Sequence, residues 1–109
     1  MSDFKAEYIK YRVEKCKEAF SDAKLLADQE RWNASLNRLY YACYYIVSAL
    51  ALKNNIETKT HSGLKNQLNL HFIKPGLLSA DSGRLYSDLF DSRQKGDYRQ
   101  IYSTLMKKL

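Results

Sequence analysis

The stretch WNASLNRLYYACYYIVSALALK, residues 32–53, decides the fold, and the rest of the chain is arranged around it. On a helical wheel at about 100° per residue, its large apolar side chains share one broad face. The opposite face would be charged on an ordinary surface helix, but here it carries mainly hydroxyls and one cation. We therefore predict a helix buried on both sides, one against its own bundle and the other against a ligand groove or a second subunit. The first face consists of Leu36, Leu39, Tyr40, Cys43, Ile46, Val47 and Leu50, and the second of Arg38, Tyr41, Tyr45 and Leu52, with Asn37 and Ser48 at its margins.

Length and composition indicate one compact helical domain over residues 1–109. The chain is 45% hydrophobic, with one Pro and four Gly, and is long enough for a single core. No apolar run is long enough to cross a membrane, and the first residues lack the apolar core of a secretion signal. We therefore expect a cytoplasmic protein without membrane contact. Cys16 and Cys43 lie on predicted core faces, where a free thiol acts as a small hydrophobe.

The charge favours an anionic partner without deciding it. The formal net charge is +6 and the pI about 9.3, which makes nucleic acid the first candidate. Most basic residues are interleaved with acidic ones, which is equally typical of a solvated helix surface. Only Arg93, Lys95 and Arg99, followed by Lys107 and Lys108, gather locally.

The first two helices are predicted to form an antiparallel pair. Ser2 or Asp3 can cap a helix that runs to about Gln29, and after a short break Asn33 can cap the second. Asn54 and Asn55 favour the left-handed conformation that ends a helix. The apolar stripe predicted for the first helix comprises Ile9, Val13, Cys16, Ala19, Phe20, Ala23, Leu26 and Ala27.

Two further helices and a short last one complete the prediction. The third runs from about His61 to Lys74, is capped by Thr60 or Ser62, and stops at Pro75-Gly76. On its wheel one side carries His61, Leu64, Leu68, His71 and Phe72. The fourth follows the cap-forming residues 79–82 and ends near Lys95, with an apolar arc of Leu85, Tyr86, Leu89 and Phe90. A capping-box pattern at Asp97 and Gln100 predicts a short fifth helix. The expected fold is all-α, an up-and-down four-helix bundle with a short fifth C-terminal helix.

The sequence contains no glycine-rich phosphate loop and no Cys or His spacing that suits zinc, so we expect no metal and no cofactor. His61 and His71 are about 15 Å apart along one predicted helix, too far to share a metal. For His71 we predict a partly buried, hydrogen-bonded role. His61 stands at a helix start, and the sequence leaves open whether it plays the same role or meets a ligand.

Arg93 projects into the middle of the apolar arc of the fourth helix. Its permanent charge requires a carboxylate, several carbonyls or an anionic ligand there. A salt bridge to Asp97 or to another acid and a phosphate contact near Arg38, Tyr41 and Tyr45 are both compatible with the sequence. The tyrosines around the second helix, Tyr40, Tyr41, Tyr44 and Tyr45, favour core or dimer packing over stacking on bases.

Three short motifs, in this order, resemble the small bacterial branch of the HEPN superfamily. They are Arg38 with Tyr40-Tyr41-Ala42, Thr60-His61-Ser62-Gly63, and RQKGDY, which holds Arg93, Gly96, Asp97 and Tyr98. The resemblance spans residues 19–98. It implies a four- to five-helix bundle that forms a homodimer with the arginine motifs bordering a common cleft. It also implies a place beside a minimal nucleotidyltransferase, in a toxin–antitoxin or stress-response pair.

The sequence departs from this family at its catalytic motif. Many relatives are metal-independent ribonucleases in which a His follows the late Arg within a few residues. Here no His follows Arg93, and Tyr98 stands where it would be expected. Tyrosine titrates near 10, so acid–base cleavage lacks its usual group unless His61 reaches the cleft. The chain is also shorter at its C-terminus than is common in the family, which leaves the far wall of the cleft undefined.

We therefore predict a dimeric HEPN module, without full ribonuclease activity, that binds a nucleotide, RNA or a nucleotidyltransferase partner. Arg93 would contact the anion and Asp97 would orient it, while Tyr98, Arg38, Tyr41 and Tyr45 would line the cleft. The first alternative is a metal-independent ribonuclease toxin that uses Arg93 with His61 or Tyr98. The second is a structural subunit that assembles through its tyrosine face.

Overall fold

The computed structural model describes residues 2–95 and shows only helices there, which confirms the all-α prediction. Its elements are α1 (Ser2–Asp28), α2 (Trp32–Lys53), α3 (His61–Leu68), the π-helical turn η1 (Asn69–Ile73) and α4 (Ala80–Lys95). The bounds of the first two helices agree with the predicted bounds within two residues. The predicted fifth helix, starting near Asp97, lies outside the described residues. Within residues 2–95 no helix is long and apolar enough to cross a bilayer.

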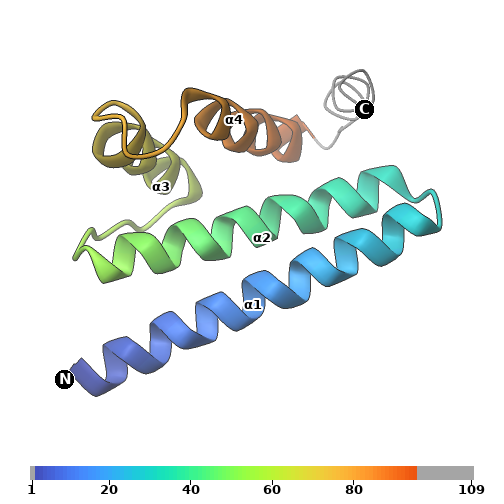
Figure 1. Ribbon diagram of the computed structural model, residues 1–109. Helices are drawn as coiled ribbons and strands as arrows, with labels where there is room; N and C mark the ends of the chain where they lie inside the picture. Colours follow the sequence, from blue (N-terminus) through green and yellow to red (C-terminus); the bar gives the residue numbers. More distant parts are fainter. Residues whose placement is uncertain (1, 96–109) are drawn as a thin grey trace.

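Helix α2 is the central element of the described fold. It packs against α1 along its length and also contacts α3 and α4, whereas α1 contacts no other described helix. Figure 1 shows the consequence: α1 and α2 lie antiparallel as one layer, and α3 and α4 lie across the other side of α2. This arrangement explains why both faces of α2 are apolar or aromatic.

The first two helices end in the same way, with a left-handed residue after the last turn. Glu30 (φ 58°) follows α1 and Asn55 (φ 59°) follows α2. At each end the next N–H returns to the last turn, from Arg31 to the Leu26 carbonyl and from Ile56 to the Ala51 carbonyl, both 2.9 Å. This is the Schellman arrangement. It confirms the expectation for Asn55.

The prediction that Asn33 caps α2 is wrong. The observed N-cap lies two residues earlier, at Arg31, whose side chain makes no capping bond, and the helix begins at Trp32. The Arg31 carbonyl accepts the first helical bond from the Ser35 N–H at 2.9 Å. The tight closure of α1 brings the chain directly into α2, so Asn33 already lies inside the first turn.

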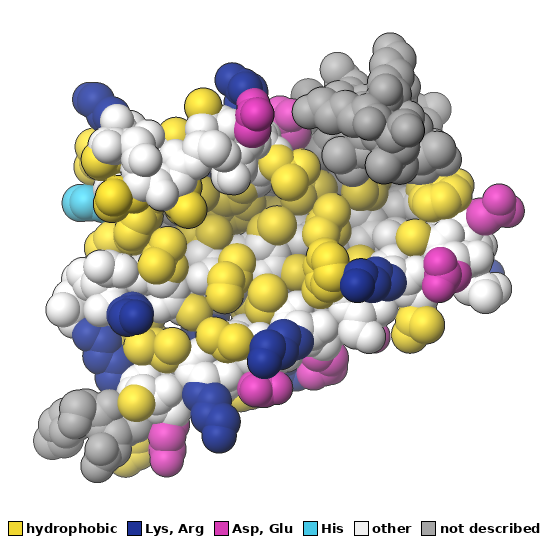
Figure 2. All heavy atoms as spheres, in the orientation of Figure 1, with side chains coloured by type: hydrophobic (Ala, Val, Ile, Leu, Met, Phe, Trp, Pro, Cys, Tyr) yellow, Lys and Arg dark blue, Asp and Glu magenta, His cyan; other side chains and the backbone are white. Residues whose placement is uncertain are grey.

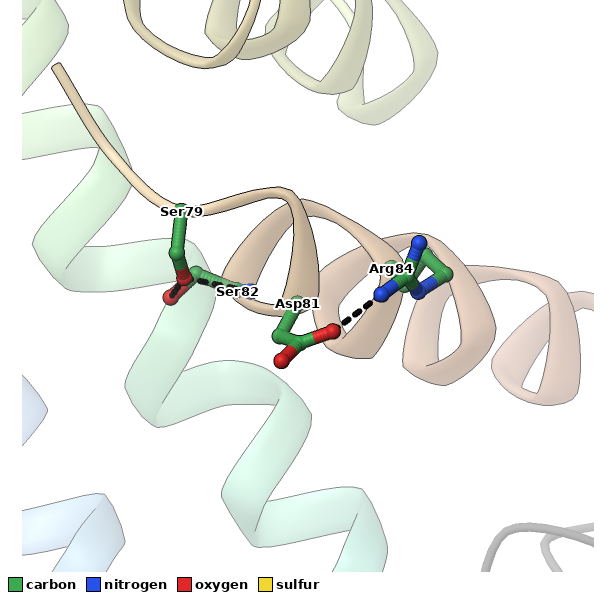
Figure 3. Close-up of polar contacts among 4 residues, drawn as sticks. All are labelled: Ser79, Asp81, Ser82 and Arg84. Carbon is green, nitrogen blue, oxygen red and sulfur yellow. Dashed lines mark hydrogen bonds and ion pairs between the residues drawn. The ribbon is translucent and has the colours of Figure 1, made fainter. Parts of the chain in front are cut away.

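Side-chain caps start α3 and α4. The Thr60 hydroxyl accepts a hydrogen bond from the Gly63 N–H at 2.8 Å. A Cβ at Gly63 would lie 3.0 Å from the same hydroxyl, so glycine lets the cap close. At α4 the Ser79 hydroxyl accepts from the Ser82 N–H at 3.1 Å, beside an exposed Arg84–Asp81 ion pair (Figure 3).

A π-helical turn corrects the prediction of one regular helix from His61 to Lys74. The Lys74 N–H bonds to the Asn69 carbonyl, five residues back, at 2.8 Å. The wider turn keeps Phe72 buried with Leu64 and Leu68. It leaves His71 exposed, so the partly buried role predicted for His71 is wrong.

The core lies between α2 and the layer of α3 and α4. Its buried members are Leu36, Tyr40, Leu68, Phe72, Tyr86, Leu89 and Phe90. Small residues instead line the contact between α1 and α2, where Ala19 and Ala23 are buried and the Ser35 hydroxyl donates to the Ala23 carbonyl at 2.7 Å. Small side chains allow the two helix backbones to approach closely.

Two residues assigned to core faces are exposed. Ile46 is 44% and Phe20 45% exposed. Among the described helices α1 packs only on α2, so side chains at the edges of the predicted apolar faces of these two helices are not covered by a neighbour. Figure 2 shows hydrophobic side chains gathered over the surface between the α1–α2 pair and the layer of α3 and α4.

Candidate functional site

The tyrosine side of α2 forms the floor of a cluster that brings together residues from α2, α3 and α4. Tyr40 is completely buried, and its ring lies 5.2 Å from that of Tyr41 and 6.0 Å from that of Tyr86 on α4. Tyr45 extends the row, 6.4 Å from Tyr41 and 5.5 Å from Tyr44. Burial raises the pKa of Tyr40 to about 12, so the phenol keeps its proton.

Arg93 reaches this floor from the last turn of α4. Its guanidinium lies 5.4 Å from the Tyr40 ring centre and 5.6 Å from the Tyr41 ring centre, and its Nε donates to the Tyr41 hydroxyl at 3.2 Å. The side chain is half-buried. The aromatic setting predicted for Arg93 is therefore present, 52 residues away in sequence from its hydrogen-bond partner.

Arg38 approaches the same ring. Its guanidinium lies 4.9 Å from the Tyr41 ring centre. Two permanent positive charges from α2 and α4 thus share one tyrosine. Rings attract cations through their electron-rich faces, but the two guanidinium groups repel one another. The arrangement concentrates positive charge on a partly exposed surface.

His61 closes the cluster from the start of α3. The Thr60 cap fixes this turn, and it places the imidazole Nδ1 2.5 Å from the Tyr40 hydroxyl. The imidazole also stacks on Tyr44, with ring centres 4.3 Å apart at 18°. Burial, and after it the positive charge of Arg93, lower the pKa of His61, so its ring is neutral near pH 7.

The tautomer of His61 determines what this contact can do. If Nε2 carries the proton, Nδ1 accepts from the Tyr40 hydroxyl. If Nδ1 carries it, the imidazole donates to the Tyr40 oxygen, and the Nε2 lone pair is available as a base. The geometry fixes the ring in either case.

Not every residue considered from the sequence belongs to this cluster. Asp97 and Tyr98 lie outside the described residues. His71 is exposed on η1 and is not part of the cluster. Cys16 and Cys43 are free thiols, and burial raises the pKa of Cys43 to about 11. Within residues 2–95 no group of three or more His, Cys, Asp or Glu side chains could hold a metal.

Sequence reasoning missed the contribution of Tyr40 and Tyr86. Sequence reasoning predicts core or dimer packing for Tyr40, whereas in the structure its hydroxyl holds His61. The Tyr86 hydroxyl is buried without a hydrogen-bond partner among the described residues, and burial raises the pKa of its phenol. The wheel could not reveal these roles, because it assigns a face to the ring but no partner to the hydroxyl.

Fold and site together define a helical bundle protein with a basic, aromatic cluster between its second, third and fourth helices. Comparison with known families narrows this class: the sequence model of the HEPN domain matches residues 9–108. The chain therefore belongs to the HEPN domain family, as its motifs predicted.

Curated relatives are similar over most of the chain. A Thermotoga maritima protein named UPF0332 protein is 37% identical over 97 residues, which cover 89% of this chain and 74% of the relative. A Methanocaldococcus jannaschii protein named "Putative toxin MJ0605" is 30% identical over 92 residues, covering 84% of this chain and 69% of that one. No solved structure matches the sequence.

Proposed function

We propose that the protein is a HEPN module that binds the phosphate of an RNA or nucleotide at Arg93 and Arg38. The observation that carries this proposal is the meeting of both guanidinium groups at the Tyr41 ring, 4.9 and 5.6 Å from its centre. An anion between or beside them would relieve the repulsion, and guanidinium groups match phosphate oxygens in a forked geometry. Tyr45 extends the aromatic surface, and in the proposal Asp97 orients Arg93 while Tyr98 lines the cleft.

The proposal includes a homodimer and a partner. Large side chains such as Ile46, Phe20 and Leu25 are 44–62% exposed, and such exposed side chains suit an interface. Two of the curated relatives carry toxin names. On this basis the protein acts in a toxin–antitoxin or stress-response pair, with a minimal nucleotidyltransferase as the expected partner.

The direct test is the affinity of Arg93→Ala for a fluorescently labelled RNA oligonucleotide. Loss of a charge-assisted hydrogen bond costs about 1.5–3 kcal/mol, which corresponds to roughly ten- to hundredfold weaker binding. Arg84→Ala is the matched control, because Arg84 lies on the same helix, is 71% exposed at its side chain and pairs with Asp81. Equal affinity of the Arg93 variant and wild type, with mass and helicity unchanged, would rule out this anion site.

A second candidate function, metal-independent RNA cleavage, is favoured by the position of His61. The imidazole is held by Tyr40 and Tyr44 in the cluster that Arg93 enters. A neutral imidazole could take the proton of a ribose 2′-hydroxyl as that oxygen bonds to the phosphorus and the bond from phosphorus to the 5′-oxygen breaks. The leaving 5′-oxygen would take a proton from water or from the imidazolium, while Arg93 stabilises the charge that develops on the phosphate. This replaces the His absent after Arg93 with one from another helix.

Cleavage and simple binding are separated by His61→Gln, assayed with chelator present. In a ribonuclease, His61→Gln would lower the cleavage rate far more than it lowers RNA affinity, whereas His71→Gln would change neither. Wild-type protein that binds RNA and leaves it intact would leave the binding module as the function.

A further inference from the structure

A second surface of the molecule carries basic and aromatic side chains, apart from the Arg93 cluster. It is a groove of about 910 Å³ between the N-terminal part of α1, the C-terminal part of α2 and the connection to α3. Its volume lies at the upper end of the range for ligand sites. Neither Arg93, Tyr40 nor Tyr41 lines it, but His61 and Tyr44 do, so the two surfaces meet at the stacked pair.

The charges of the groove are unbalanced. Lys5, Arg12 and Lys59 line it, against one acid, Glu57. None of the three cations forms an ion pair with a carboxylate of the described residues. Lys5 bonds instead to the Asn55 side-chain oxygen, and Arg12 donates to the Ser48 hydroxyl at 3.1 Å. These are neutral acceptors, so the positive potential of the groove is retained.

Aromatic side chains stand beside these cations with faces or edges open to solvent. Phe4 is 74% and Tyr8 56% exposed, although a bundle helix ordinarily turns such residues inward. The Arg12 guanidinium lies 5.6 Å from the Tyr8 ring centre. Tyr44 and His61 form the inner wall. Cations interleaved with exposed rings along a groove are typical of single-strand nucleic-acid binding, in which bases stack and phosphates follow the charge.

We propose that this groove is the path of a single-stranded RNA segment that continues from the Arg93 cluster past His61 onto α1. Bases stack on Phe4 and Tyr8, and phosphates contact Lys5, Arg12 and Lys59. The inference rests on the proposed function for the class of ligand. It adds a separate contact surface, and it assigns to the first turns of α1 a role beyond packing.

The length of the RNA separates the two sites. A dinucleotide is short enough to engage the Arg93 cluster alone, whereas an oligouridylate of about 12 nucleotides can also fill the groove. We therefore expect Lys5→Ala/Lys59→Ala to weaken binding of the long probe only. The salt dependence of its affinity should become shallower by about 0.7 in logarithmic slope for each phosphate that the variant no longer neutralises. Tyr8→Ala should weaken the long probe about tenfold, because a base can no longer stack there.

A charge-matched control comes from the same helix. Lys10 and Lys17 are exposed and lie outside the groove, so Lys10→Ala/Lys17→Ala removes the same charge without touching it. This control should bind both probes nearly as well as wild type. If the groove variant and the control weaken binding of the long probe equally, the loss of affinity comes from net charge alone, and the inference is overturned.

The possible failures are distinguishable. If Arg93→Ala weakens both probes while the groove variants bind the long probe as wild type does, the groove inference falls and the anion site stands. If only the groove variants weaken the long probe, the groove stands and the anion site falls. A third outcome would overturn the RNA assignment: polyglutamate of equal charge displaces the long probe, and Tyr8→Ala binds the long probe as tightly as wild type. The groove would then be a site for an acidic protein segment.

Discussion

The contact between Tyr40 and His61 gives a sharp test of the site geometry. Tyr40→Phe removes one oxygen and keeps the ring, so the packing against Tyr44 and Tyr86 is preserved. The variant lacks the part-buried hydrogen bond between the Tyr40 hydroxyl and the His61 Nδ1, which is 2.5 Å long. A bond of this kind contributes about 1 kcal/mol net, and up to about 3 kcal/mol when its partner is left unsatisfied. For a domain of this size we expect a fall in Tm of about 4 °C or more.

A double-mutant cycle isolates that bond from the rest of the packing. His61→Ala removes the bond and also the stacking on Tyr44, so it should cost more than Tyr40→Phe. Each single variant loses the bond, whereas the double variant loses it only once, so its destabilisation should be smaller than the sum of the two single effects. This difference, the coupling energy, should be about 1 kcal/mol in urea unfolding near pH 8, where His61 is neutral. Tyr11→Phe is the control, since Tyr11 is 54% exposed and should change stability by less than about 0.5 kcal/mol. Additive effects of the two substitutions would refute the Tyr40–His61 contact.

Three further predictions concern pH, the helix cap and a thiol. Since burial and Arg93 lower the pKa of His61 below 6.5, the unfolded state binds more protons at low pH. Stability should therefore be full above pH 6.5 and fall as the pH drops toward the folded pKa. In pH-dependent unfolding, His61→Gln should flatten this fall and His71→Gln should not; a profile unchanged by His61→Gln contradicts the assignment. Thr60→Ala should cost about 1 kcal/mol in thermal unfolding through loss of the bond to the Gly63 N–H, and Thr60→Ser should restore most of it; equal stability of all three proteins would exclude the cap. Because burial raises the pKa of Cys43 to about 11, mass spectrometry should find it unalkylated by iodoacetamide near pH 8 in the folded protein and alkylated in urea; comparable labelling in both states would show an accessible thiolate.

Much of the fold was predictable because its signals are local. The apolar periodicity of residues 32–53 and the residues that flank them predicted a helix that ends where α2 ends and begins within two residues of its start. Asn55 and Thr60 act where backbone geometry and side-chain hydrogen bonding direct them. The prediction for Asn33 was wrong because the tight end of α1 leads directly into α2. The prediction for His71 was wrong because a π-helical turn replaces the regular helix that the wheel assumes.

The candidate site was predicted in its residues more than in its contacts. Arg93, Arg38 and Tyr41 were grouped from charge and wheel position, and the structure brings them to one ring. The hydrogen bond of His61 to Tyr40 had no sequence signal, since a wheel describes angles about one helix axis and says nothing of a second helix. The exposed Ile46 illustrates the same limit, because exposure depends on how far neighbouring helices extend.

The sequence by itself determined the helices, their order, the aromatic character of both sides of α2 and the family to which the chain belongs. These features follow from side-chain periodicity, capping and short motifs, all of which act within a few residues. Tertiary structure alone decided that His61, Arg38 and Arg93 gather around Tyr40 and Tyr41, and that a basic groove opens beside α1. The physical reason is that helix crossing and the extent of coverage depend on packing between segments 21 to 52 residues apart, which no local pattern specifies.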